Sequence, residues 1–160
     1  MLNIIVAVDE NMGIGKDNKL LAHISPDLKY FKRMTEGKTV VMGYNTYMSL
    51  PVRPLKNRKN IIITSKNIEI QGAIVMNSIE EVLKYSQSNI NEEIFIIGGA
   101  SIYKQFLNHA DKLYITHIFD KFEADTFFPS IEDWKLKSAF GTHENLNHKH
   151  KHMFAMYQKK

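Results

Sequence analysis

Residues 94–103 read Ile-Phe-Ile-Ile-Gly-Gly-Ala-Ser-Ile-Tyr, and this stretch says most about the fold. Four consecutive apolar residues, three of them isoleucine, are typical of a strand buried on both faces. Two glycines follow, and a helical pattern begins after Gly99. Glycines let the backbone approach a ligand closely, and the start of a helix attracts phosphate. A bare Gly-Gly pair is also an ordinary strand-to-helix turn, so a nucleotide site here remains a hypothesis.

Further short apolar runs lie on both sides of this unit, at residues 4–8, 39–42, 61–64, 73–76 and 113–116. Helical patterns also follow Ser25 and Ser78, so strands and helices alternate. This alternation predicts an α/β fold with a mixed, mostly parallel sheet flanked by about four helices. Residues 134–140 and 150–157 alternate instead, with no helical pattern between them. They predict an antiparallel C-terminal hairpin at one edge of the sheet.

Composition limits the number of domains and the class of protein. The length suits one domain over residues 1–160, and 44% hydrophobic with 24% charged residues is ordinary for a globular protein. The absence of cysteine excludes disulfides and fits a reducing compartment. The sequence shows no signal peptide and no apolar run of roughly 18 residues. We therefore expect a cytoplasmic monomer without membrane contact. The net charge of +4, without a dense Lys/Arg block, argues against nucleic-acid binding.

The stretch Ser25-Pro26-Asp27 opens the first predicted helix. Ser25 suits the N-cap, Pro26 the first helical position, and Asp27 the first turn, where a carboxylate complements the helix dipole. Phe31 lies four residues on and shares a helix face with Asp27. A carboxylate beside an apolar face is costly unless something binds it, and a flat ligand with an amidine-like nitrogen group would do so. A purely structural carboxylate is the alternative.

Other candidates lie in loops, because ligands of open α/β sheets bind beyond the carboxyl ends of the strands. Arg58 can hold a carboxylate through two hydrogen bonds. Residues 64–66, Thr-Ser-Lys, can hold a phosphate, and residues 13–18, with two glycines, suit a lid. Ordinary polar loops and turns are the alternative for each.

Three histidines, His148, His150 and His152, are spaced by two. On a strand they would share one face and could bind a metal. The lysines between them favour an exposed edge instead, and we expect no metal site.

Taken in order, these pieces resemble dihydrofolate reductases over essentially the whole chain. The matching elements are Ile14-Gly15, Asp27-Leu28-x-x-Phe31-Lys32, Val41-Met42-Gly43-x-x-Thr46, Arg53-Pro54-Leu55, Arg58-Lys59-Asn60-Ile61, Ile97-Gly98-Gly99-x-x-Ile102-Tyr103, Thr116 and Asp125-Thr126-x-Phe128-Pro129. The resemblance implies NADPH-dependent reduction of 7,8-dihydrofolate to 5,6,7,8-tetrahydrofolate, with hydride going to C6 and a proton to N5. It also implies a role in one-carbon metabolism and binding of antifolate inhibitors.

The resemblance further implies roles for single residues. Asp27 would be catalytic and hydrogen-bond the pteridine edge, with Thr116 behind it and Arg58 on the α-carboxylate of the substrate. The folate pocket would be lined by Ile5, Ala7, Leu28, Phe31, Leu50 and Leu55. The cofactor would be bound by Ala7, Ile14, Gly15, Gly43, Tyr44, Asn45, Thr46, Thr64, Ser65, Lys66, Ile97, Gly98, Gly99, Ala100, Ser101, Ile102 and Tyr103. Of these, residues 64–66 would hold the adenosine 2′-phosphate.

Three positions depart from the family pattern. Ala22 replaces a tryptophan near the pterin, Tyr44 replaces a phosphate-binding arginine, and Ala124 replaces a glycine. Two other functions remain as alternatives: a pyrimidine reductase of riboflavin synthesis, which shares this fold, and a non-catalytic pterin- or nucleotide-binding module. The helix carrying Asp27 and Phe31, together with Arg58, favours the folate reading.

Overall fold

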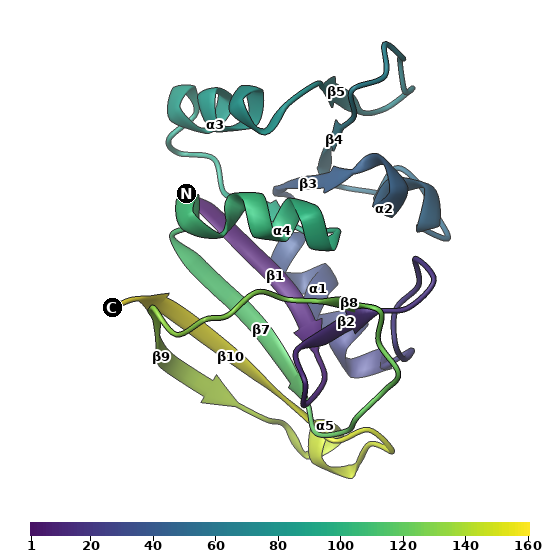
Figure 1. Cartoon of the computed structure of the whole chain (residues 1–160), viewed down its shortest axis with the longest axis vertical. Coiled ribbons are helices and arrows are strands. Elements are labelled where there is room, and N and C mark those ends of the chain that lie inside the picture. Colours follow the sequence, from purple (N-terminus) through teal and green to yellow (C-terminus); the bar gives the residue numbers. More distant parts are fainter.

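A single sheet of eight strands organises the computed structural model, which describes all 160 residues. The strands are β1 (Leu2–Val8), β3 (Thr39–Gly43), β4 (Lys59–Ile63), β5 (Ile74–Met76), β6 (Ile94–Ile96), β7 (Lys112–Ile118), β9 (Trp134–Phe140) and β10 (His152–Lys159). Their order is β5-β4-β3-β6-β1-β7-β10-β9 (Figure 1). All neighbours from β5 to β7 are parallel, and β10 runs antiparallel to both β7 and β9. The predicted mixed, mostly parallel α/β fold is confirmed.

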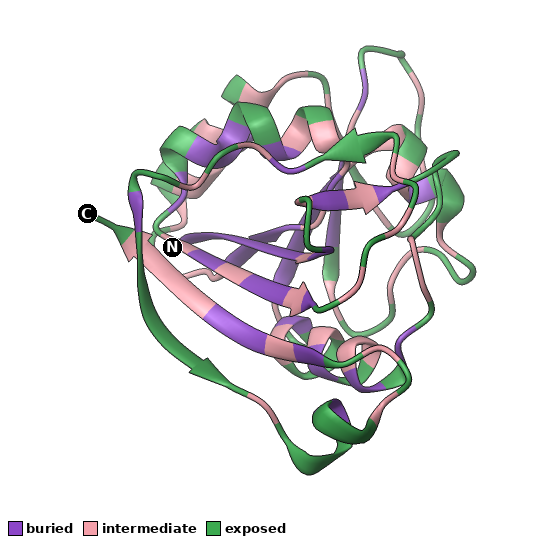
Figure 2. Ribbon diagram, turned by 60° about the horizontal axis from the view of Figure 1, so that its bottom comes forward, coloured by how far each residue is buried: buried purple, intermediate pink, exposed green.

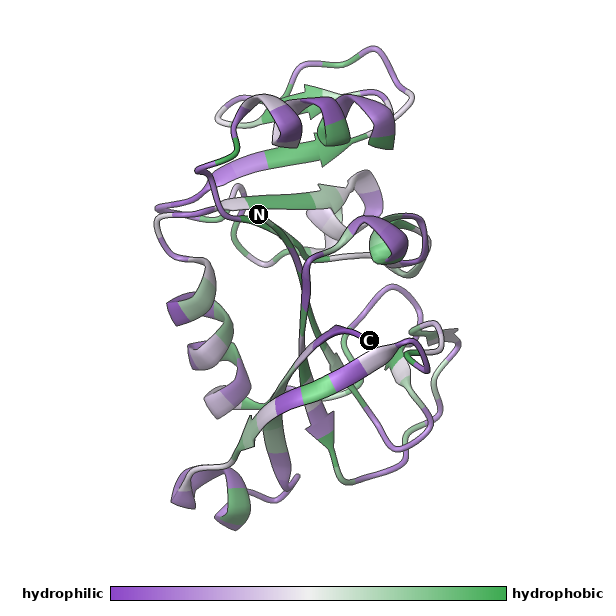
Figure 3. Cartoon of the chain, turned by 90° about the vertical axis from the view of Figure 1, so that its left-hand side faces the viewer, coloured by the Kyte–Doolittle hydropathy of each residue, from purple (hydrophilic) through white to green (hydrophobic).

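Helices cover both faces of the sheet. They are α1 (Ser25–Thr35), α2 (Tyr44–Ser49), α3 (Ile79–Ser88), α4 (Ala100–Phe106) and α5 (His143–Asn147), with a 3₁₀ turn at Leu107–His109. In Figure 1, α4 lies in front of the sheet and α1 behind it, and Figure 3 shows the sheet running between them. None of these helices combines the length and apolar character needed to cross a membrane.

The core has two halves because β1 buries side chains on both faces. Ile4 and Val6 pack towards α3 and α4, in a cluster with Phe106. Ile5 packs the other way, in a cluster with Tyr30 of α1. This two-sided burial explains why the central strands read as continuous apolar runs.

The C-terminal part differs from its prediction in one element. The short helix α5 lies between β9 and β10, where no helix is predicted, so the sheet and its loops carry five helices rather than about four. A capping box closes its start, with the Thr142 hydroxyl accepting from the Asn145 N–H. A helix of five residues is too short to leave a hydrophobic period in the sequence.

Two smaller predictions are also wrong. Ile24, not Ser25, is the N-cap of α1, and no side chain caps this helix; the fixed φ of Pro26 suits its first turn instead. The histidine stretch is not an exposed edge. β9 forms the edge and is exposed along most of its length (Figure 2), while β10 lies inside the sheet with His152 fully buried. The three histidines do not form a metal site, since no group of three or more His, Asp or Glu side chains is arranged to hold one.

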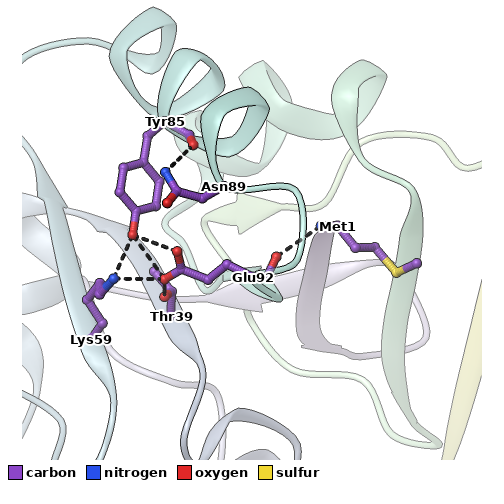
Figure 4. A network of polar contacts seen from close by, with 6 residues as sticks. All are labelled: Met1, Thr39, Lys59, Tyr85, Asn89 and Glu92. Carbon is purple, nitrogen blue, oxygen red and sulfur yellow. Dashed lines mark hydrogen bonds and ion pairs between the residues drawn. The ribbon is translucent and has the colours of Figure 1, made fainter.

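A polar network ties together the amino ends of the parallel strands (Figure 4). The Tyr85 hydroxyl donates to Glu92 Oε2 at 2.7 Å, and Lys59 Nζ lies 3.1 Å from Glu92 Oε1. Thr39 donates to the same carboxylate, and the N-terminal amine donates to the Glu92 carbonyl at 3.0 Å. This network holds together the end of the sheet opposite to the predicted ligand sites.

Candidate active site

Asp27 is placed by the packing of α1 on β10. Tyr30 stacks on Phe154 with ring centroids 3.9 Å apart, a contact that adds to simple burial. Phe154 pairs in register with Thr116 on β7. The Thr116 hydroxyl consequently reaches the first turn of α1 and donates to Asp27 Oδ1 at 2.6 Å. Residues 89 positions apart thus meet through strand register.

The environment of Asp27 raises the pKa of its carboxyl above the usual range. Burial is the main cause, since it disfavours the charged form. The hydrogen bond from Thr116 and the charge of His152 act in the opposite direction and only partly offset it. A carboxyl with a raised pKa can exchange a proton closer to neutral pH, as a general acid or base requires.

An apolar cleft opens beside Asp27. It is lined by Ala7, Ile14, Leu20, Leu21, Ala22, Ile24, Asp27, Leu28 and Ile118. Asp27 is the only ionisable side chain among these residues. An apolar cleft with a single convergent polar group is typical of a site for a flat ligand.

A lid, residues 13–24, forms one wall of this cleft. Its strand β2 (Gly13–Gly15) pairs with β8 (Thr126–Phe127) in a separate two-stranded sheet. Asp125 fastens the tip, because its carboxylate accepts from the Asp17 N–H at 2.9 Å and its own N–H donates to the Gly15 carbonyl at 3.0 Å. Five residues of this segment line the cleft: Ile14, Leu20, Leu21, Ala22 and Ile24.

The base of the lid is held by a buried carboxylate, Asp9, that was not predicted from the sequence. Asp9 is 3% exposed and accepts hydrogen bonds from the N–H groups of Asn11, Gly13 and Phe122. Its only signal in the sequence is its position, directly after a buried strand. Leu20, Leu21, Ile24 and Ile118 were likewise not predicted to line the cleft.

Several predicted substrate residues lie together on the α1 face of the sheet. Ile5, Phe31, Leu50 and Leu55 belong to one hydrophobic cluster. Arg58 lies beside it, with its guanidinium 6.0 Å from the centre of the Phe31 ring and Nη1 donating to Thr35 Oγ1 at 3.1 Å. Partial burial lowers the pKa of Arg58, but a guanidinium stays charged in proteins. The arrangement offers a cation at the end of an apolar wall.

The predicted dinucleotide residues meet at the carboxyl ends of β3 and β6. The Gly43 N–H donates to the Gly98 carbonyl at 2.9 Å. Gly98 has φ +128°, which L side chains rarely adopt, and a Cβ on Gly99 would lie only 3.2 Å from Thr46 Oγ1. The backbone conformation at Gly98 and the close approach of Thr46 to Gly99 therefore favour glycine at both positions of this cradle.

Tyr103 and Lys66, two further predicted cofactor residues, have different surroundings. Tyr103 is almost fully buried, and its hydroxyl donates to the Ile5 carbonyl at 2.9 Å, which ties α4 to β1. Lys66 is exposed, with Nζ 4.8 Å from the centre of the Tyr44 ring. Lys66 and Tyr44 thus form one cationic corner.

The geometry can be set against known proteins. The chain matches the family model described as dihydrofolate reductase over residues 1–159. It is 42% identical to the dihydrofolate reductase of Bacillus subtilis (strain 168), covering 100% of this chain and 95% of the relative. It is 36% identical to that of Staphylococcus haemolyticus, covering 99% and 95%. A solved structure, dihydrofolate reductase from Enterococcus faecalis complexed with NADP(H) and RAB-propyl, superposes with a TM-score of 0.90 at 36% identity, covering 100% of this chain and 96% of the other.

The fold and the cleft, taken with these matches, define an α/β oxidoreductase. The chain belongs to the dihydrofolate reductase family, as the motifs indicated.

Proposed function

We propose that the cleft around Asp27 is where this chain reduces 7,8-dihydrofolate to 5,6,7,8-tetrahydrofolate with NADPH. Membership of the family supplies the reaction and the cofactor. The observation that carries the assignment of the site is a single buried carboxyl, hydrogen-bonded to Thr116, in an otherwise apolar cleft.

Asp27 orients the substrate and assists its protonation. Its carboxylate accepts hydrogen bonds from the N–H groups at the edge of the pteridine ring, while Thr116 fixes the direction of the carboxylate. The raised pKa of Asp27 lets this carboxyl draw a proton from solvent near neutral pH and favour protonation at N5 through water. NADPH supplies the hydride that C6 receives.

The remaining groups bind, position and exclude water. Ile5, Ala7, Leu28, Phe31, Leu50 and Leu55 give an apolar surface for the flat substrate, and Arg58 holds the α-carboxylate of its glutamate tail. With substrate bound, the lid would exclude water and so strengthen the electrostatic interactions inside the cleft. These residues would hold the two flat rings in contact, as direct hydride transfer requires.

The glycine cradle and the cationic corner fit the dinucleotide. Gly98, Gly99 and the start of α4 offer backbone N–H groups and close approach to a pyrophosphate. Thr64, Ser65 and Lys66, at the carboxyl end of β4, suit the 2′-phosphate of the adenosine. Ala7, Ile14, Thr46 and Ile97 would surround the nicotinamide and its ribose.

Antifolate inhibitors are expected to compete for the same cleft, and we expect the chain to act as a monomer in the cytoplasm. The lack of cysteine suits a reducing compartment. Light scattering of the purified chain at working concentration tests the monomer.

The direct test follows NADPH absorbance with and without dihydrofolate, in the wild-type chain and in Asp27→Asn. We expect substrate-dependent NADPH oxidation that the variant largely loses. Binding of both ligands without absorbance loss would instead identify a non-catalytic binding module. Turnover of a riboflavin-pathway pyrimidine in place of dihydrofolate would identify the other reductase.

A further inference from the structure

His150, in the segment that precedes β10, has no part in the mechanism above, yet most of its side chain is buried. Its Nδ1 lies 2.7 Å from Asp120 Oδ2, so the proton on Nδ1 is donated to that carboxylate. The neutral and the protonated ring can both supply this proton, so the contact does not depend on the charge of the histidine. The ring also packs against Phe122, with ring centroids 5.3 Å apart. His150 thus contacts residues 119–122, the segment that follows β7, at two side chains.

The residues that His150 contacts hold the base of the lid. The Asp120 carbonyl accepts from the Glu10 N–H at 3.0 Å. The Phe122 N–H donates to Asp9 Oδ2 at 3.0 Å, and the other oxygen of that carboxylate accepts from the Gly13 N–H at 2.8 Å. Gly13 is the first residue of the lid, so the position of residues 119–122 determines where the lid begins.

Few other bonds join the segment before β10 to the segment after β7. The ladder of β7 and β10 continues for one bond beyond its last register pair, with the Phe119 N–H donating to the Lys151 carbonyl at 2.9 Å. Past this bond, His150 makes the only hydrogen bond between its own segment and residues 120–122. The Asp120 carboxylate accepts from no other donor. The link between the two segments therefore depends on one histidine side chain.

We propose that His150 is a positioning residue that fixes residues 119–122 and, through them, the base of the lid. The inference rests on the proposed function, since it concerns the release of ligands from the cleft assigned above. Ile14 follows the first residue of the lid and lines the cleft with Asp27, so a shift at the base of the lid moves a wall of the binding site. The motion of lids of this kind often sets the rate of ligand release. His150 thereby slows that release without touching a ligand.

The first test measures the base of the lid directly, by hydrogen exchange of single amides in the ligand-free chain. The Gly13 and Glu10 amides report the base of the lid, and the amides of β3 and β4 report opening of the sheet. In His150→Ala, we expect exchange at Gly13 and Glu10 to become about 5-fold faster or more, the effect of losing one hydrogen bond to a charged group. Exchange in β3 and β4 should keep its wild-type rate.

Two further variants show that the contact with Asp120 is responsible. His150→Asn places an amide N–H near the position of Nδ1 and should restore most of the slow exchange. Asp120→Ala removes the acceptor but keeps the backbone carbonyl that binds Glu10, and it should speed exchange as His150→Ala does. In the double variant the two effects should not add, because both substitutions remove the same contact.

Glu93→Ala is the matched control. Glu93 Oε2 lies 2.6 Å from Lys38 Nζ, and the Glu93 side chain is 39% exposed, against 42% for Asp120. This ion pair lies at the amino end of the sheet, next to the start of β6 and away from the lid. The control should therefore leave exchange at Gly13 and Glu10 unchanged.

The second test measures release of NADPH by stopped flow, after the loaded chain is mixed with an excess of NADP⁺. We expect His150→Ala to release NADPH about 5-fold faster or more, and His150→Asn and Glu93→Ala to stay close to the wild type. Wild-type exchange at Gly13 in His150→Ala, fully additive effects in the double variant, an equal change in Glu93→Ala, or an unchanged rate of release would overturn the proposal. Neither readout needs turnover, so a chain that binds NADPH but does not reduce dihydrofolate would contradict the proposed function alone.

Discussion

At the residue scale, Asp27 opposes the stability of the ligand-free chain at neutral pH. Its pKa is raised in the folded state, chiefly by burial, so the folded chain binds the proton more tightly than the unfolded chain does. The contribution to stability is complete below the ordinary pKa of a carboxyl. It is lost as the pH rises through the raised value, so at neutral pH the residue is a net cost.

Asp27→Asn should therefore make the chain more stable and less active at once. The amide fills the same volume without a charge, so we expect the free energy of unfolding at neutral pH to rise by on the order of 1 kcal/mol. Turnover should fall by about 100-fold or more. Denaturant unfolding at neutral and acidic pH measures the first, and the gain should vanish in acid. A variant that is less stable than the wild type at neutral pH would contradict the cost assigned to Asp27.

Lys66 and Tyr44 should set the preference between the two nicotinamide cofactors. The ammonium lies over the Tyr44 ring, a contact that favours cations at this corner. NADPH differs from NADH by a phosphate of about two negative charges. Lys66→Ala should lower kcat/KM for NADPH while barely changing it for NADH, and Tyr44→Arg should raise the ratio, since arginine binds phosphate in two places at once. Both effects should shrink at high salt. An unchanged ratio in Lys66→Ala would place the phosphate elsewhere.

The sequence alone identified functional residues whose amino-acid type indicates their role. Asp27 could be predicted because a carboxylate beside an apolar helix face costs free energy wherever the helix lies in the fold. Asp9 was not predicted and His152 was predicted at an exposed edge, because the environments of both depend on strands far away along the chain. The lysines around His152 pointed to an exposed edge, and only the insertion of β10 between β7 and β9 buries the ring.

At the element scale, the pairing of β2 with β8 depends on a missing side chain. A Cβ on Gly13 would lie 2.6 Å from the Ala124 Cβ and 3.0 Å from Asp9 Oδ1. Gly13→Ala should therefore force the lid away from β8, raising KM for the substrate and speeding release of the cofactor. Stopped-flow measurement of cofactor release follows the change directly.

A double-mutant cycle isolates the contact. Adding Ala124→Gly to Gly13→Ala removes the closer of the two clashes, so it should restore part of the binding while the approach to Asp9 remains. Gly141→Ala serves as control, since its Cβ would meet Met153 at 3.3 Å, away from the lid. Purely additive effects of the two lid substitutions would show that Ala124 does not crowd the lid.

Elements with a long period or a continuous apolar run were predicted well, and short ones were not. The six parallel strands and the helices predicted after Ser25, Ser78 and Gly99 match their predictions. The helix α5 was not predicted, because a helix of about one turn leaves no hydrophobic periodicity in the sequence. The N-cap was predicted at Ser25 rather than Ile24 because serine is a favoured N-cap residue. Tertiary packing, however, decides where a helix starts.

At the scale of the whole molecule, the polar network that stabilises the sheet and the cleft proposed for catalysis lie at opposite ends of the strands. The Glu92 network joins the amino ends, and the cleft lies beyond the carboxyl ends. Burial tends to raise the pKa of Glu92, but hydrogen bonds from Thr39, Tyr85 and Lys59 outweigh it, so the pKa is lowered overall. Its contribution to stability is present above the ordinary pKa of a glutamate. It is lost as the pH falls through the lowered value.

Glu92→Gln should lower the free energy of unfolding at neutral pH by about 1 kcal/mol, the scale of a partly exposed charged hydrogen-bond network. The loss should fade in acid, as the pH falls below the ordinary pKa of a glutamate and through the lowered pKa of Glu92. Turnover should not change. A loss of turnover that matches the loss of stability would mean that the two ends of the sheet are coupled.

The strand order has a consequence for how the protein is made. A ribosome delivers β10 after every other strand, yet β10 lies inside the sheet, between β7 and β9. Until it emerges, β7 has a bare edge and Tyr30 has no ring beneath it. In such a nascent chain, the unpaired N–H and C=O groups of β7 can pair with other chains that are being made on the same messenger RNA. Pairing of this kind is a known route to misassembly. Slow synthesis of residues 152–159 would prolong that exposure, so the pace of translation of this segment bears on the yield of active enzyme.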